Sequence, residues 1–145
     1  MFQYNTCLTE LHLQKMNFSD HDIELLVLGL VYNRSLLLLD LCCNNIADDG
    51  IAHLGSYLKL GPPLRGLMLG HNRITDGGAR FLSFTTPYSK LFLLDIAHNE
   101  LTDAGILDIL NSIKKAYPLG ILYVWGNSIT RTSCKVVFFL SLLCF

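Results

Sequence analysis

The feature that most constrains the fold of this chain is a leucine pattern that recurs about every 28 residues. Five segments align, and their first leucines are separated by 28, 28, 27 and 28 residues. The segments are LTELHLQKMNF, LLLLDLCCNNI, LRGLMLGHNRI, LFLLDIAHNEL and LGILYVWGNSI, starting at Leu8, Leu36, Leu64, Leu91 and Leu119. A fixed period of this length predicts a solenoid, in which each unit buries its apolar side against its neighbours.

Five positions of the aligned segments explain how such units would stack. The first, fourth, sixth and eleventh residues are apolar in every copy. The ninth residue is asparagine in four copies and Met16 in the first. An inward-pointing asparagine is tolerated only when it is hydrogen-bonded, and its amide has the donors and the acceptor needed to bridge neighbouring turns. We therefore expect an asparagine ladder whose first position is broken at Met16.

A second pattern follows each segment and predicts a helix. An aspartate recurs just ahead of each stretch with helical spacing, at Asp20, Asp48, Asp76 and Asp103. Ser/Thr-Asp at this place supplies a helix cap and a negative charge that the helix dipole favours. In the second helix Ile51, Leu54 and Leu58 fall on one face, which should pack on the strands. Gly50 and Gly78 lie at helix starts, where small residues allow close packing.

The unit L-x-x-L-x-L-x-x-N-x-L, followed by a helix, resembles the leucine-rich repeat of the ribonuclease-inhibitor-like family. The match runs from about residue 5 to residue 130. It implies an α/β fold, a horseshoe-shaped solenoid of about five strand–helix repeats with a parallel sheet on its concave side. Residues 1–130 would form this domain, followed by a non-repeat apolar tail, 131–145. Members of the family act mainly by binding other proteins.

The end of the pattern carries two further expectations. Arg131 stands where the next helix-starting aspartate should be, and the pattern then dissolves into TSCKVVFFLSLLCF, so we expect an atypical or truncated end of a longer protein. The stretch LYVWGNSITRTSC resembles the last repeat of one group of vertebrate leucine-rich repeat proteins. This resemblance implies a nuclear or nucleolar regulatory protein of germ or stem cells whose partners are nucleolar proteins.

Composition narrows the range of partners. Eleven basic and twelve acidic residues give a formal net charge of -1. This balance offers no general attraction to nucleic acid or anionic lipid, although a local patch could exist, and we expect no specific nucleic-acid partner. The longest apolar run, residues 136–145, is far shorter than the roughly 20 residues of a membrane-spanning helix, so we expect no membrane role.

The cysteines indicate a reducing compartment. Five cysteines are present, at Cys7, Cys42, Cys43, Cys134 and Cys144. Their number is odd and their spacing builds no disulfide framework, and the start of the chain has no signal peptide. We therefore expect reduced thiols in an intracellular protein of the cytoplasm, the nucleus or both.

The concave sheet is the predicted binding surface, because residues between the leucines of a strand point away from the core. The predicted partner-binding residues are Asp40, Cys42, Met68, Leu93, Asp95, Tyr123 and Trp125. Tyr123 and Trp125 should share a face, and exposed aromatic side chains are typical binding hot spots. Alternatively, a cap or a further repeat covers Trp125.

Catalytic and metal chemistry are not favoured. Asp40 and Asp95 lie two repeats apart, and strands about 4.8 Å apart would separate them by roughly 10 Å, too far for paired carboxylates to act together. Cys43, His71 and His98 share a column, but a linear row directs its side chains in parallel rather than toward a tetrahedral zinc. We expect no catalytic site, no cofactor and no metal.

The leading functional hypothesis is a non-enzymatic protein-interaction scaffold, with the aspartates selecting basic groups on the partner. One alternative is a GTPase-activating-type regulator of a small GTPase, which turnover assays would separate from a scaffold. Another is a fragment of the sensor arm of an innate immune receptor, which would require a nucleotide-binding domain elsewhere in the protein.

Overall fold

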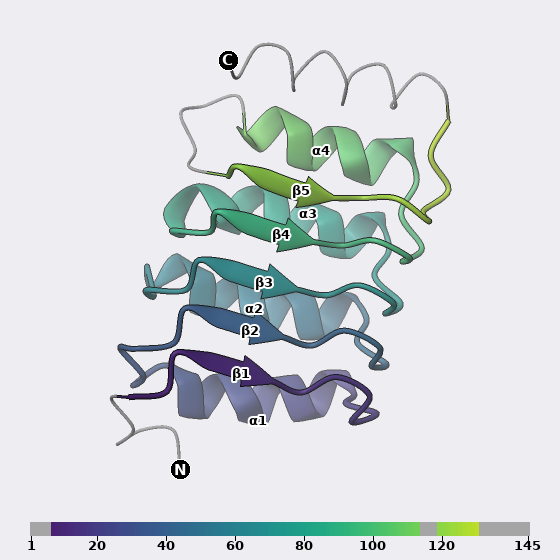
Figure 1. Ribbon diagram of the computed structural model, residues 1–145. Coiled ribbons are helices and arrows are strands. Elements are labelled where there is room, and N and C mark those ends of the chain that lie inside the picture. Colours follow the sequence, from purple (N-terminus) through teal and green to yellow (C-terminus); the bar gives the residue numbers. More distant parts are fainter. Residues whose placement is uncertain (1–6, 114–118, 131–145) are drawn as a thin grey trace.

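The computed structural model describes residues 7–113 and 119–130 and shows a two-layer solenoid (Figure 1). One layer is a parallel sheet whose strands follow one another in chain order: β1 (Glu10–His12), β2 (Leu38–Asp40), β3 (Gly66–Met68), β4 (Leu93–Asp95) and β5 (Ile121–Tyr123). The other layer holds the helices: α1 (Asp20–Leu30), α2 (Asp48–Lys59), α3 (Asp76–Thr85) with the short η2 (Thr86–Tyr88), and α4 (Asp103–Ile113). The predicted tail, 131–145, lies outside the described residues.

The sheet register follows the repeat period. Leu39 of β2 pairs with Leu11 of β1 and with Leu67 of β3, and Leu67 pairs in turn with Leu94. The apolar columns of the three middle repeats are completely buried between sheet and helices. The predicted α/β solenoid with its parallel sheet is therefore confirmed. None of the described helices is long and apolar enough to cross a membrane.

The asparagine ladder forms as expected. Asn72 donates from its amide nitrogen to the carbonyl oxygens of Leu41, at 3.0 Å, and Leu69, at 2.9 Å. Its amide oxygen accepts from the backbone N–H of Ile46 at 3.1 Å. One side chain thus joins the turns of two repeats, and Asn44, Asn99 and Asn127 make equivalent bonds. Met16 takes the place of asparagine in the first repeat, and its backbone N–H donates to the amide oxygen of Asn44.

The helix-starting aspartates form a second ladder. Asp48 accepts from the backbone N–H of Thr75 at 2.8 Å and from its hydroxyl at 2.5 Å, across to the next repeat. Asp76 makes the same two bonds to Thr102. Burial raises the pKa of the Asp76 carboxyl group, but the hydrogen bonds lower it by more, so its pKa lies below the usual value. The predicted helix cap is present at Thr75, the residue before α3, whose hydroxyl accepts from the backbone N–H of Gly77. At the corresponding position before α2 the chain has Ala47, which has no side chain to form a cap.

The glycines at the helix starts make room for this ladder. A Cβ at Gly50 would lie 2.6 Å from an Asp20 carboxylate oxygen, and one at Gly78 would lie 2.7 Å from an Asp48 oxygen. Both distances are well inside van der Waals contact. The predicted reason for glycine, close packing at the start of a helix, is confirmed, and at both positions the approaching groups are the bridging carboxylate and a methyl group of the preceding isoleucine, Ile46 or Ile74.

Candidate interaction surface

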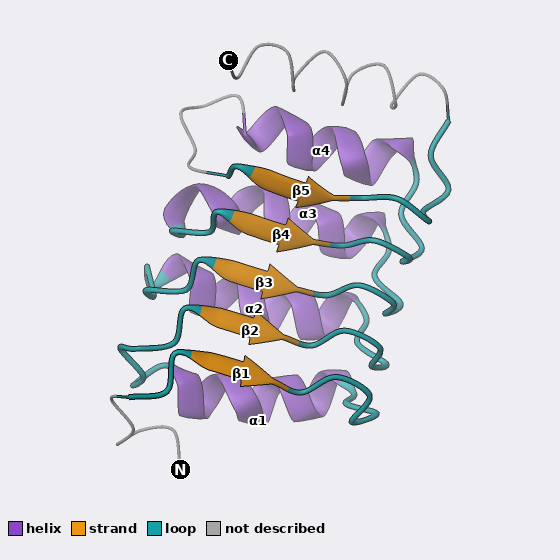
Figure 2. Ribbon diagram, in the orientation of Figure 1, coloured by secondary structure: helices purple, strands orange, loops and turns teal. Residues whose placement is uncertain are grey.

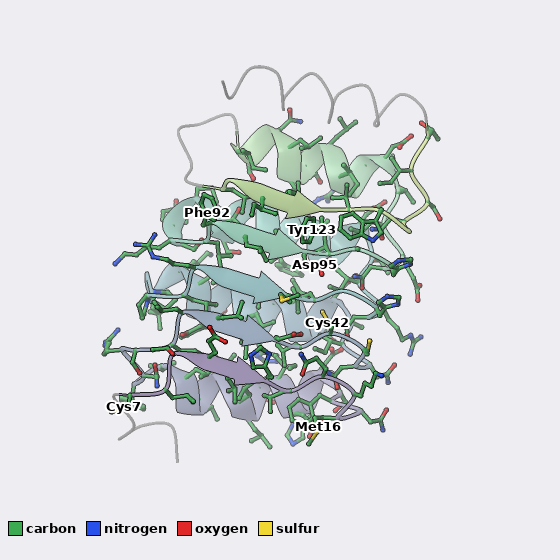
Figure 3. The ribbon with its side chains drawn as sticks, in the orientation of Figure 1. Cys7, Met16, Cys42, Phe92, Asp95 and Tyr123 are labelled. Atoms are coloured by element: carbon green, nitrogen blue, oxygen red, sulfur yellow. The ribbon has the colours of Figure 1, made fainter. Side chains whose placement is uncertain are left out.

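The helices lie along one face of the sheet, and the other face is left open by the described elements (Figure 2). The predicted partner-binding residues come from the strands of this open face and from the turns that follow them. The middle column runs across the strands as His12, Asp40, Met68, Asp95 and Tyr123, as the register requires. Leu93 lies one column earlier. Cys42 follows Asp40 by two residues, and Trp125 follows Tyr123 by two residues. Cys42, Asp95 and Tyr123 lie on the same side of the sheet (Figure 3).

Asp40 and Asp95 depart from the expectation, because they are only 5% and 9% exposed. One oxygen of Asp40 accepts from the backbone N–H of Cys42 at 3.0 Å, and the other accepts from the amide of Gln14. Asp95 accepts from the backbone N–H of Ala97 at 2.9 Å. Each carboxylate is thus bonded to the turn that follows its own strand. The idea that both carboxylates are open to a partner's basic groups is therefore corrected.

Two glycines explain why these side chains can settle onto the sheet. A Cβ at Gly70 would lie 3.2 Å from an Asp95 oxygen, so the carboxylate occupies the space that the missing side chain leaves. In the same way a Cβ at Gly66 would collide with the side chain of Leu38. The middle of the surface is therefore filled by side chains from adjacent strands and offers no deep pocket.

Cys42 lies near the two aspartates, and its thiol has low reactivity. Burial, a hydrogen bond to Asp40, and the negative charges of Asp40 and Asp95 together raise the pKa of its thiol from 9.0 to about 12. A cysteine attacks or binds metal as the thiolate, which is scarce at neutral pH under these conditions. Cys42 is suited to act as a small apolar contact rather than as a nucleophile.

This environment predicts slow chemical labelling of Cys42. Alkylation by iodoacetamide at neutral pH should be at least about a hundredfold slower in the folded chain than in urea, because only the thiolate reacts. Residue-resolved mass spectrometry measures the two rates, with the exposed Cys7 as the control that changes much less. Equal rates for Cys42 in both states would show that its environment does not suppress the thiolate.

Tyr123 and Trp125 form the most prominent feature of the surface. Their ring centroids lie 4.6 Å apart with the rings tilted by 48°. Trp125 is 54% exposed and is the only tryptophan of the chain, whereas Tyr123 is half-buried. The predicted sharing of a face is confirmed. A tilted aromatic pair with one open ring is a rigid, largely apolar anchor that loses little conformational entropy when a partner covers it.

The column that suggested zinc has a different structural role. Cys43, His71 and His98 adopt left-handed backbone conformations, with φ of 56°, 57° and 51°, where the chain turns sharply after each strand. The rings of His71 and His98 stack with centroids 4.2 Å apart and planes within 11°. Stacked parallel rings do not direct their nitrogens at a common point. Among the described residues no group of three histidine, cysteine or acidic side chains is placed to hold a metal ion.

One row of exposed side chains was not predicted from the sequence. The second residue of each repeat, just before the strand, points outward, and Leu37 and Phe92 are 41% and 49% exposed there. The Phe92 ring packs over Gly120, where a Cβ would collide with it. The sequence did contain a sign of this row, because Leu37 and Phe92 are large apolar residues at a repeat position that does not belong to the buried columns.

Comparisons with known proteins agree with this architecture. A family model described as "Leucine Rich repeat" matches residues 32–55, 62–83 and 90–110. Mouse leucine-rich repeat-containing protein 34 is 33% identical over 136 residues, which cover 92% of this chain and 33% of that protein. Pig ribonuclease inhibitor is 36% identical over 90 residues, covering 61% of this chain and 20% of that protein. The chain thus spans a third or less of the length of these relatives.

A solved structure, titled leiomodin-1 actin-binding site 2, superposes with a TM-score of 0.78 over 94% of this chain and 80% of that chain. The two are 16% identical, so this likeness concerns the fold alone. The repeat period, the two-layer solenoid and the matches in sequence converge on one assignment. The chain belongs to the leucine-rich repeat proteins, with repeats of the ribonuclease-inhibitor-like kind.

Proposed function

We propose that the chain is a non-enzymatic protein-interaction scaffold that binds a protein partner on its concave sheet. Its membership of the leucine-rich repeat proteins supports the general role of a scaffold. The observation that carries the choice of surface is the Tyr123–Trp125 pair, in which an open indole stands beside a second ring. Met68 and Leu93 are half-buried on the same face and extend the apolar contact toward the middle of the sheet.

The charge of this surface suggests the chemistry of its partner. Its three columns contain Glu10, Asp40 and Asp95 and no lysine or arginine. The two buried aspartates are bonded to the amide of Gln14 and to backbone N–H groups and are not offered to a partner. We infer a partner that places an apolar group against Trp125 and whose basic groups meet no lysine or arginine on this face.

We propose an intracellular site of action, in the cytoplasm or the nucleus, with the nucleolus as the compartment implied by the resemblance of the last repeat. Two of the described cysteines support an intracellular site, because Cys42 and Cys43 are neighbours in sequence and both are free thiols. Imaging of the tagged chain in cells tests the compartment.

The concave surface is tested by affinity capture with a Tyr123→Ala/Trp125→Ala variant. Hot-spot side chains contribute about 2 kcal/mol or more each, so the variant should lose partner binding by about a hundredfold or more. The matched control is Leu28→Ala/Phe81→Ala, which removes two large exposed apolar side chains, 63% and 45% exposed, from helices α1 and α3. Circular dichroism verifies that both variants are folded. Capture that is unchanged in the first variant, or lost only in the control, would contradict this assignment.

A further inference from the structure

The charges of this nearly neutral chain are separated along the repeat. Three stretches contain no acidic residue: 25–39, 50–75 and 77–94. Each includes the connection from a helix to the next strand, and four exposed basic residues lie in or beside these connections: Arg34, Lys59, Arg65 and Lys90. We call the side of the solenoid formed by these connections the basic edge. Within the described residues no ion pair joins these four cations to a carboxylate.

The helix dipole explains only part of this separation. Aspartates at helix starts and a lysine in the last turn of α2, Lys59, both complement the dipole. Arg34, Arg65 and Lys90, however, lie in loops beyond the last turn of any helix, where the dipole has little effect. Their charges are not needed to stabilise a helix and remain available to a partner.

Apolar side chains flank one of these cations, Arg65, at the beginning of the strands. The backbone N–H of Arg65 donates to the carbonyl of Leu37 at 2.8 Å, and that of Phe92 donates to the carbonyl of Arg65 at 2.7 Å. These bonds place Leu37, Arg65 and Phe92 side by side, about 4.8 Å apart as in any sheet. Phe92 lies at the end of the sheet where the strands begin, away from Tyr123 (Figure 3). The row presents an aliphatic side chain, a guanidinium and an aromatic ring in order.

A groove extends the row toward the helices. It is lined by Lys59 at the end of α2 and by Phe84 and Tyr88 of α3 and η2. Phe84 and Tyr88 are 63% and 66% exposed, which is unusual for aromatic rings without a partner. A Cβ at Gly61 would lie 3.8 Å from the carbonyl oxygen of Tyr88, so the two connections run next to each other. A cation therefore lines the groove together with two open rings.

We propose that the basic edge is a second docking surface, which binds an acidic protein segment that also carries aliphatic side chains. Its carboxylates pair with Lys59, Arg65 and Lys90, and its aliphatic side chains pack between Phe84 and Tyr88. Charge complementarity favours this occupant, because the described helix-to-strand connections hold cations and no carboxylate. The nearby Asp108, which lines a neighbouring hollow with Phe84 and Tyr88, is paired with Arg80. The exposed aliphatic side chains of Leu37 and Leu60 along the edge offer an acidic peptide apolar contacts, whereas a polynucleotide would use only the cations and the aromatic rings. This surface is distinct from the acidic concave sheet.

The test measures fluorescence anisotropy of a labelled peptide of glutamates with a leucine at every third position, titrated with the full chain at low salt. In an Arg65→Gln/Lys90→Gln variant the peptide should bind about tenfold more weakly, as expected for the loss of two exposed ion pairs. The matched control, Lys15→Gln/Arg73→Gln, changes the net charge equally. Lys15 and Arg73 are exposed and lie in the turns that follow β1 and β3, at the other end of the strands from the basic edge, so the peptide affinity should change less than about twofold.

Three results would overturn the proposal. The first is an equal loss in both charge variants, which would mean non-specific attraction. The second is tighter binding of an oligouridylate of the same charge, which would identify the edge as a polynucleotide site. The third is loss of peptide binding in the Tyr123→Ala/Trp125→Ala variant, which would place the peptide on the concave sheet. Unchanged peptide binding in that last variant supports the edge, whatever becomes of the concave site.

Discussion

Replacement of Asn72 by alanine is expected to destabilise the folded chain by about 3 kcal/mol, because it leaves buried backbone groups without partners, at about 1–3 kcal/mol each. The side chain is 7% exposed and bonds two carbonyl oxygens and one N–H from two different repeats. Alanine can replace none of these bonds. The loss should weaken the junction between the second and third repeats.

Urea unfolding followed by circular dichroism measures this change. Asn45→Ala is the control, because Asn45 is exposed and makes only a 3.4 Å bond with Arg73. It should change stability by less than about 0.5 kcal/mol, as most surface substitutions do. Similar losses in the two variants would mean that the ladder contributes no more than a surface amide.

Replacement of Asp48 by alanine is expected to cost about 2 kcal/mol, because charge-assisted hydrogen bonds contribute about 1.5–3 kcal/mol and this ladder position is only partly buried. Asp48 joins the start of α2 to both the backbone N–H and the hydroxyl of Thr75 in the next repeat. The substitution also leaves empty the space that Gly77 and Gly78 provide for the carboxylate.

The adjacent Asp49 supplies a close control for the Asp48 variant. Both aspartates lie in the first turn of α2, so both favour the helix dipole, but Asp49 is exposed. Asp49→Ala should therefore cost only the dipole contribution, about 0.5 kcal/mol. Thermal unfolding of the two variants side by side isolates the bridge between repeats. An equal loss would assign the whole effect of Asp48 to the helix dipole.

Much of the fold is readable in the sequence because the repeat period encodes it. Once the leucines of LDLCCNNI are aligned with those of the other segments, the strand register, the buried columns and the asparagine ladder follow from the spacing. The second ladder was missed because an aspartate before a helix already has a sufficient local explanation as part of a cap. Its bond to a threonine about 27 residues later depends on how two helices align in space.

The candidate surface was predictable in outline and not in detail. Alternation along a strand predicts which side chains leave the core, and Tyr123 and Trp125 accordingly share the concave face. Burial of Asp40 and Asp95 could not be predicted, because that of Asp40 depends on the amide of Gln14 and that of Asp95 on Gly70, which follows the adjacent strand. Likewise the left-handed turn at His71 had no signal, because glycine or asparagine would be expected there.

The most direct test of the central claim is hydroxyl-radical footprinting of the chain with and without a captured protein partner. Oxidation is read by mass spectrometry at single aromatic residues, and Trp125 and Phe81 report on the sheet face and the helical face. A saturating partner is expected to protect Tyr123 and Trp125 and to leave Phe81 unchanged. Full oxidation of Trp125 in the complex, with protection of Phe81 instead, would contradict the concave sheet as the binding surface.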